Sequence, residues 1–197
     1  MRIVAGTARG RALKGPRGPG LRPTADRVRE TVFNILGQWL DGQVVLDLFA
    51  GTGALALEAL SRGAARAVLV DSGREAVRLC HENAAELGMT DRVQVVFAPV
   101  DAKSLRRVRG PFDLVFADPP YAAQTPTQIL ELLCNTGLLA PAGRLVVEHD
   151  KRVESPEALA DLRREDQRLF GDTSVSFYRR EPPSLTPEEP HGHDGAP

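Results

Sequence analysis

From Gln43 onward, short apolar runs alternate with segments of helical periodicity, and no other feature of the chain constrains its fold as much. This alternation is typical of strand–helix–strand units, in which the helix carries the chain back so that successive strands run parallel. It predicts an α/β fold built on a parallel sheet. The expected strands are residues 44–48, 67–70, 93–97, 113–117 and 144–148, and the expected helices are residues 54–61, 74–87, 102–107, 126–135 and 156–163.

The C-terminal part of the chain departs from this alternation. Residues 167–170 and 174–178 are two further runs separated by Gly171 and Asp172, which is typical of a β-hairpin. The last strand should therefore run antiparallel to its neighbour. The whole pattern predicts a Rossmann-like, seven-stranded, mostly parallel sheet.

Composition divides the chain into three expected parts. Residues 1–40 should form a basic N-terminal extension of a hairpin and a helix, and residues 41–180 the main domain. Residues 181–197 contain five prolines and a single large apolar residue, Leu185. Such a composition predicts a disordered Pro-rich tail.

The N-terminal extension has its own pattern. Residues 1–23 are rich in Gly, Pro and Arg, and β-like pieces at 2–5 and 11–14 suggest a hairpin or a loose arm. Thr24 is a candidate N-cap for the helix that follows. The apolar face of this helix should pack on the main domain, and Trp39 at its end should serve as a core anchor. This face is formed by Val28, Val32, Ile35, Leu36 and Trp39.

The N-terminal segment is opposite in charge to the remainder. Residues 1–29 contain eight basic residues and one acidic residue, a net charge of +7, whereas the whole chain has −1, so the remainder carries −8. A basic arm on an acidic body favours a polyanionic partner such as nucleic acid. The candidates for contact with RNA phosphates are Arg22, Arg27 and Arg29.

Composition also argues against several classes of protein. Hydrophobic residues at 42% and charged residues at 26% of 197 are ordinary for a soluble globular protein. No apolar stretch approaches the roughly 20 residues that cross a bilayer, so no membrane association is expected. Cys80 and Cys134 are widely spaced, which fits reduced thiols in a cytoplasmic protein better than a disulfide or a metal site. We expect no functional metal.

A glycine-containing turn follows the first expected strand of the sheet, with the sequence Asp47-Leu48-Phe49-Ala50-Gly51-Thr52-Gly53. Glycines let the backbone approach a ligand closely, and open α/β sheets bind ligands outside the carboxyl ends of their strands. Asp71 ends the second strand 20 residues after Gly51, where a carboxylate accepts hydrogen bonds from ribose. The candidate cofactor-binding residues are Asp47, Phe49, Gly51, Gly53, Asp71, Ser72, Asp101 and Ala102.

More than one interpretation of this turn remains open. Residues 51–56 also fit a permissive dinucleotide fingerprint, which would suggest an NAD-dependent oxidoreductase, whereas a P-loop is excluded because no Gly-Lys-Ser/Thr follows. A strand–helix turn without a ligand is a further alternative. Asp47 favours S-adenosylmethionine, because it could meet the ammonium group of that cofactor. Asp101 and Ala102 could bond its adenine, and Asp101 could equally cap a helix.

Asp118-Pro119-Pro120-Tyr121 follows the apolar run 112–117 and is the candidate catalytic tetrapeptide. A base amino nitrogen is a poor nucleophile because its lone pair is delocalised into the ring. Hydrogen bonds to the Asp118 carboxylate and the Pro119 carbonyl would favour the pyramidal geometry that directs the lone pair at a sulfonium methyl group. The two prolines stiffen the loop. Tyr121 would stack on the base, a contact worth about 1–3 kcal/mol. These four residues form the predicted amine clamp.

With these residues the chain resembles the RsmD family, bacterial guanine-N2 methyltransferases of 16S ribosomal RNA that use S-adenosylmethionine. The resemblance spans residues 1–180 in family order. The matching stretches are residues 1–6, 22–34, 47–53, 118–121 and 171–173. It implies a Rossmann-like class I methyltransferase fold, a cytoplasmic location and a guanine of 16S rRNA, within the small ribosomal subunit, as substrate.

The chain departs from the RsmD pattern in two places. Asp71 stands where relatives often have Glu, a shorter reach that could require a water, and the tail after Arg180 has no counterpart. Three alternative functions stay open. The clamp recognises an amine, not a whole base, so adenine-N6 methylation of DNA or RNA is possible in principle. The others are an NAD-dependent oxidoreductase and a non-catalytic RNA-binding assembly factor.

Overall fold

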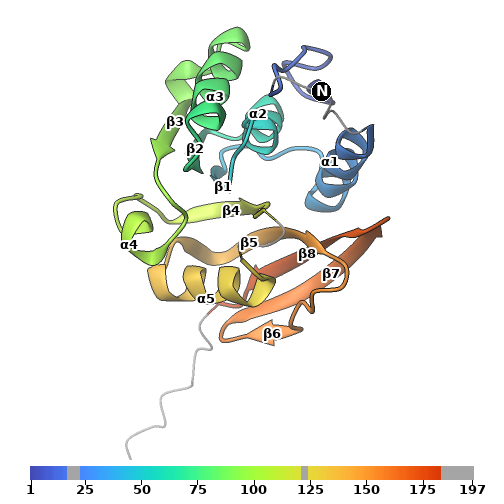
Figure 1. The fold of residues 1–197 in the computed structure, drawn as a ribbon, viewed down its shortest axis with the longest axis vertical. Coiled ribbons are helices and arrows are strands. Elements are labelled where there is room, and N and C mark those ends of the chain that lie inside the picture. The colour runs from blue at the N-terminus through green and yellow to red at the C-terminus, as the bar shows by residue number, and fades with distance from the viewer. Residues whose placement is uncertain (17–22, 121–123, 183–197) are drawn as a thin grey trace, which may run out of the picture.

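The computed structural model describes residues 1–16, 23–120 and 124–182, whose fold is shown in Figure 1. Arg22 and Tyr121, and most of the expected Pro-rich tail, lie outside the described residues. The side chains of residues 23–26, with that of the candidate cap Thr24, lie outside them as well.

The described residues form one eight-stranded sheet with five α-helices. The strands are β1 (Val44–Leu48), β2 (Arg66–Asp71), β3 (Val93–Phe97), β4 (Phe112–Ala117), β5 (Leu139–Asp150), β6 (Ala158–Leu159), β7 (Leu162–Phe170) and β8 (Thr173–Arg180). The helices are α1 (Pro23–Leu36), α2 (Ala54–Ser61), α3 (Arg74–Glu86), α4 (Ala102–Leu105) and α5 (Pro126–Thr136), with a 3-10 helix η1 (Thr90–Arg92). The strand order is β3-β2-β1-β4-β5-β8-β7-β6.

Strand direction follows the prediction. β1 to β5 pair in parallel, and β8 pairs antiparallel with both β5 and β7. The mostly parallel Rossmann-like fold with an antiparallel last strand is therefore confirmed. The sheet has one strand more than expected, because the short β6 pairs with β7.

Helices cover both faces of the sheet, which explains why the parallel strands are mostly apolar on both faces (Figure 1). Successive residues of β1 face opposite sides: Val45 packs in a cluster with α1, α2 and α3, and Leu46 in a second cluster with α4 and α5. Phe116 and Val115 of β4 divide in the same way. The sheet is thus the middle layer of three. Because helices cover both of its faces, a ligand can approach the sheet at the ends of its strands.

The strand order also fixes where a ligand can bind. β1 pairs with β2 on one side and β4 on the other, so the chain reverses its direction of travel across the sheet at β1. In open α/β sheets such a reversal leaves a crevice beyond the carboxyl ends of the two strands. The glycine-containing turn of residues 47–53, called the cofactor turn below, continues β1, and Asp118 follows β4, so both open into this crevice.

The N-terminal arm, residues 1–16, is part of the packed structure. Arg2 and Ala12 form an antiparallel bridge, which gives the arm the expected hairpin form. Ile3, Ala8 and Leu13 are buried in the cluster that contains α1 and α2.

None of the described helices is long and apolar enough to span a bilayer.

Two predictions about the fold are wrong. Residues 156–163 do not form a helix; they contribute β6 and the start of β7, with Ala160 at a positive φ of 52° between them. Trp39 is not a core anchor, since 67% of its surface is exposed. α1 ends at Leu36, and Gly37 at a φ of 99° breaks the helical register that would have buried the indole.

Candidate active site

Four carboxylates belong to the same edge of the sheet. Asp47 lies in β1, Asp71 ends β2, Asp118 directly follows β4 and Glu148 lies near the end of β5. The backbone N–H of Asp118 donates to the carbonyl of Leu48 at 3.5 Å, which ties the amine clamp to the end of β1. The carboxyl ends of parallel strands meet at one edge, so these acids converge there without being close in sequence.

A cavity of about 230 Å³ opens at this edge. It is bounded by α1, the cofactor turn, the start of α2 and the ends of β4, β5 and β8. The lining residues are Met1, Val28, Arg29, Val32, Asp47, Phe49, Ala50, Gly51, Thr52, Ala54, Leu55, Ala117, Asp118, Val146, Glu148 and Val175. Asp118 and the cofactor turn therefore face one shared space.

The cofactor turn has the left-handed backbone that its glycines permit. Gly51 and Gly53 have φ angles of 57° and 77°, and Phe49, directly after β1, has 61°, which is unusual for a residue with a side chain. A Cβ at Gly53 would lie 2.8 Å from Cδ2 of Leu69, so the turn packs directly on β2. Gly51 lines the cavity, and the space where its side chain would lie is open.

Asp71 holds the same turn in place. One carboxylate oxygen accepts from the N–H of Gly51 at 2.9 Å and the other from the N–H of Gly73 at 2.7 Å. Each carboxylate oxygen has two lone pairs, so both keep capacity for a further donor such as a ribose hydroxyl. Asp71 is half-buried at the end of β2, at the position predicted for it.

Asp47 lies deeper, with 2% of its surface exposed. Its carboxylate accepts from the N–H of Ala56 at 3.2 Å and so fixes the first turn of α2. Burial raises the pKa of Asp47 well above its usual value, and the nearby charges of Asp118 and Asp71 raise it further. A cationic ligand in the cavity would relieve this repulsion among the three carboxylates.

Asp118 lines the cavity and is exposed, but the surrounding protein removes part of the water around its carboxylate. This partial enclosure raises the pKa of Asp118 from 3.8 to about 6. The next residue, Pro119, is buried and Pro120 is exposed. The carboxylate of the clamp is thus presented to the cavity from a fixed backbone.

The raised pKa of Asp118 predicts a pH dependence. Only the ionised carboxylate accepts hydrogen bonds with both oxygens, and with a pKa of about 6 it becomes protonated as the pH falls below that value. We expect kcat/KM for methyl transfer to rise by about tenfold per pH unit up to pH 6 and to level off above pH 7. A profile that stays flat between pH 5 and pH 7 would contradict an ionised Asp118 in the reaction.

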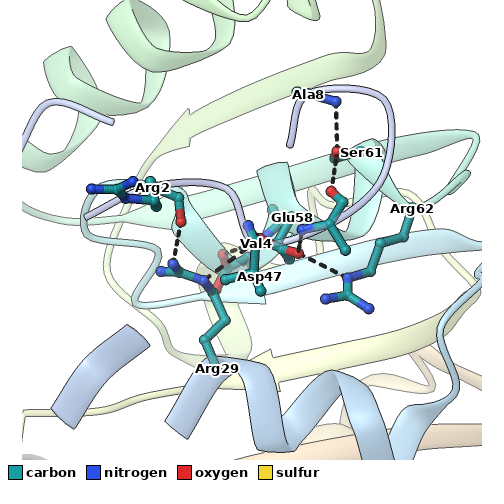
Figure 2. A network of polar contacts seen from close by, with 10 residues as sticks. Arg2, Val4, Ala8, Arg29, Asp47, Glu58, Ser61 and Arg62 are labelled. Carbon is teal, nitrogen blue, oxygen red and sulfur yellow. Dashed lines mark hydrogen bonds and ion pairs between the residues drawn. The ribbon is translucent and has the colours of Figure 1, made fainter. Parts of the chain in front are cut away.

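The prediction that Arg29 contacts RNA phosphates is wrong for this structure. Arg29 is 4% exposed and lines the cavity from α1. Its guanidinium donates to the carbonyl of Arg2, and its Nε lies 3.7 Å from a carboxylate oxygen of Glu58 (Figure 2). Arg29 therefore joins α1 to the N-terminal arm and α2, whereas Arg27, two residues earlier, is exposed.

Gly53 and Asp71 pack in or against the cofactor turn but do not line the cavity themselves, and neither do Asp101, Ser72 and Ala102. Asp101 is exposed and caps α4 by accepting from the N–H of Ser104 at 2.7 Å, a bond that lowers the pKa of Asp101. Ser72 and Ala102 are exposed. Whether these three residues touch a cofactor stays a prediction.

Sequence reasoning missed Glu148 as a candidate site residue. The weak signal was its position near the end of the expected strand that follows the clamp. Its neighbour His149 is 4% exposed, and its Nε2 lies 3.0 Å from Oγ of Ser176. In a strand successive side chains point to opposite faces, so only one of the pair can line the cavity.

The chain has relatives along most of its length. The family model described as Conserved hypothetical protein 95 matches residues 1–179. Ribosomal RNA small subunit methyltransferase D of Escherichia coli K12 is 38% identical over 182 residues, which covers 92% of this chain and 90% of that protein. The protein of the same name from Haemophilus influenzae Rd is 36% identical over 186 residues, covering 91% and 93%.

Solved structures agree with this relationship. The Escherichia coli protein yhhF superposes with a TM-score of 0.78 at 37% identity, covering 92% of this chain and 98% of that one. A hypothetical protein of Thermus thermophilus gives a TM-score of 0.73 at 33% identity, covering 90% and 98%. The chain therefore belongs to the family described as Conserved hypothetical protein 95, the RsmD family of methyltransferases that its motifs predict.

Proposed function

We propose that this protein transfers a methyl group from S-adenosylmethionine to the N2 amine of a guanine in 16S ribosomal RNA of the small subunit. The observation that carries the proposal is the cavity that Asp118 and the cofactor turn share. Relatives named ribosomal RNA small subunit methyltransferase D support the substrate class.

The residues of the cavity fit S-adenosylmethionine. Gly51 presents backbone without a side chain, and Asp71 beside it retains acceptor capacity for ribose hydroxyls. Asp47 and Asp118 supply negative charge where a sulfonium and an ammonium group would need it. The bound cofactor supplies an electrophilic methyl group; the protein has to hold the acceptor nitrogen in line with it.

Asp118 and Pro119 would perform that task. The carboxylate and the proline carbonyl accept hydrogen bonds from the two amine hydrogens, so that the nitrogen lone pair points toward the methyl group. After transfer the nitrogen is cationic, and the Asp118 carboxylate or a water takes up the released proton. Val28, Val32 and Val175 line the same cavity and exclude water from the reacting atoms.

The RNA would approach from the basic N-terminal side. Arg27 on α1 and Arg2 and Arg9 on the N-terminal arm are exposed. α1 and Met1 both border the cavity, so phosphates bound there would lie next to its mouth. Arg22 stays a candidate for the same role. These contacts would position the RNA while the clamp selects the base.

Two measurements test the proposal. Calorimetry should detect binding of S-adenosylmethionine and none of NAD. Incubation with S-adenosylmethionine and unmodified small subunits, followed by nucleoside mass spectrometry, should yield N2-methylguanosine. N6-methyladenosine in its place would establish the adenine alternative, and the absence of any methylated nucleoside would favour a non-catalytic assembly factor. No observation on the described residues favours either alternative.

Asp71→Asn should weaken cofactor binding. The amide has one acceptor oxygen instead of two, so it cannot hold the backbone N–H groups of Gly51 and Gly73 and also a ribose hydroxyl. We expect the Kd for S-adenosylmethionine to rise at least about tenfold, the cost of a hydrogen bond to a charged group. Calorimetry checks this, with exposed Asp91→Asn as the matched control. Equal affinities of the two variants would contradict the role of Asp71.

A further inference from the structure

We infer that Glu148 is the residue that selects guanine, by accepting a hydrogen bond from the N1–H group of the base. This inference rests on the proposed function, because it assigns the recognition of the base within the same cavity. The amine clamp alone does not define the substrate, since adenine, cytosine and guanine all carry an exocyclic amine.

Glu148 lies beside the clamp. β4 and β5 pair in parallel with Ala117 opposite Val147, so the residues that follow, Asp118 and Glu148, are next to each other across the two strand ends. Neighbouring strands are about 4.8 Å apart, a spacing comparable to the width of one purine edge. Both side chains line the cavity. Two carboxylates are therefore placed to contact one base.

The strand order puts Glu148 on the correct side of the clamp. Asp71 and Gly51 belong to β2 and the turn after β1, and β4 and β5 follow in that direction across the sheet. A cofactor held by Asp71 and Gly51 occupies the β1–β2 side, which leaves the β4–β5 side for the base. Glu148 then lies beside the base, on the side of Asp118 that is away from the cofactor.

The end of β5 is held firmly, as recognition of a single atom requires. Glu148 pairs with Val175 of β8, and the neighbouring His149 is buried with hydrogen bonds to Ser176 and to the carbonyl of Asp150. The base-recognition geometry would thus be built on a strand of the sheet and not on a loop, which favours precision.

The chemistry distinguishes guanine from other amine-bearing bases. N1 of guanine is protonated and donates, on the same edge as the N2 amine, whereas the ring nitrogen next to the amine of adenine or cytosine only accepts. An ionised carboxylate is an acceptor without a hydrogen to give. It therefore binds the N1–H group of guanine, whereas the lone pair of the ring nitrogen of adenine or cytosine would face the negative carboxylate and be repelled by it.

The test compares guanosine with 2-aminopurine, which keeps the N2 amine but has an N1 that only accepts. Each is placed at the mapped target position in 16S rRNA ligated from segments and assembled into small subunits. Wild-type protein should methylate guanosine with a kcat/KM at least about 100-fold above that for 2-aminopurine. In Glu148→Gln the ratio should fall at least about tenfold, because the glutamine NH₂ can donate to N1 of 2-aminopurine.

Glu154→Gln, an exposed change of the same chemistry in the loop after β5, should leave the ratio as in the wild type. A wild-type ratio below tenfold overturns the inference whether or not the variant folds, and so does a Glu148→Gln ratio equal to that of the wild type. A purely structural role of Glu148 would lower both rates together. If the wild-type protein does not methylate guanosine at all, the proposed function itself fails.

Discussion

Asp118→Asn is expected to lower kcat for methyl transfer by about 10²–10³-fold, the usual cost of losing one preorganised group that contacts the reacting atoms. Asparagine keeps the size of aspartate, but its NH₂ would oppose the amine hydrogens and its charge is absent. Affinity for S-adenosylmethionine should change far less, because Asp71 and Gly51 hold other parts of that cofactor. Single-turnover rates with small subunits, together with calorimetry, separate the two effects.

Asp91→Asn, an exposed aspartate in η1, is the matched control and should retain wild-type kinetics. The clamp hypothesis fails if Asp118→Asn keeps more than about a tenth of the wild-type kcat, since a direct acceptor for the amine contributes more than that. A variant that loses cofactor binding in proportion to its activity would indicate instead that Asp118 belongs only to the cofactor site.

Glu58→Ala should destabilise the protein by about 3–5 kcal/mol, because it leaves buried charges without their partner. Glu58 is fully buried in α2 and accepts from Nε of Arg62 at 2.9 Å and from the N–H groups of Val4 and Ala5 at 2.7 and 3.0 Å (Figure 2). Its other ionic partner is Arg29, at 3.7 Å. One carboxylate thus joins α1, α2 and the N-terminal arm.

Urea unfolding measures this loss, and exposed Glu75→Ala serves as its control. Glu75 lies 3.8 Å from Arg78 with more than half of its side chain in solvent, so its removal should cost about 0–1 kcal/mol. If both variants unfold at the same urea concentration, the buried network contributes no more than a surface ion pair. Because Met1 and Arg29 line the cavity, we also expect Glu58→Ala to weaken cofactor binding.

The layered architecture followed from the sequence because apolar runs and turn residues act locally. The βα alternation predicted β1 to β5, and Gly171 with Asp172 predicted the β7–β8 hairpin. The predicted helix at residues 156–163 was wrong. Ala and Leu have high helix propensity, but pairing with β8 and within the β6–β7 hairpin decides the structure of this segment. Such strand pairing cannot be recognised from the local periodicity of the sequence.

The residues of the candidate site also divide into those that local sequence could predict and those that it could not. Asp47 lies near the end of a strand, and Gly51 and Asp118 follow strands, so all three could be placed at the carboxyl edge from sequence alone. Arg29 was assigned to the surface from its charge, because its partner Glu58 lies in a different helix and is 29 residues further along the chain. Glu148 became a candidate only when the strand order placed β5 beside β4. Positions set by the adjacent sequence could therefore be predicted, whereas contacts between residues far apart in the sequence could not.

A crystal structure with S-adenosylhomocysteine tests the central claim most directly. The ribose hydroxyls should lie on Asp71, and the sulfur should face the Asp118 carboxylate across the cavity, with open space for a base between Asp118 and Glu148. A ligand bound outside the cavity, or a sulfur directed away from Asp118, would contradict a clamp that holds a base amine in line with the methyl donor.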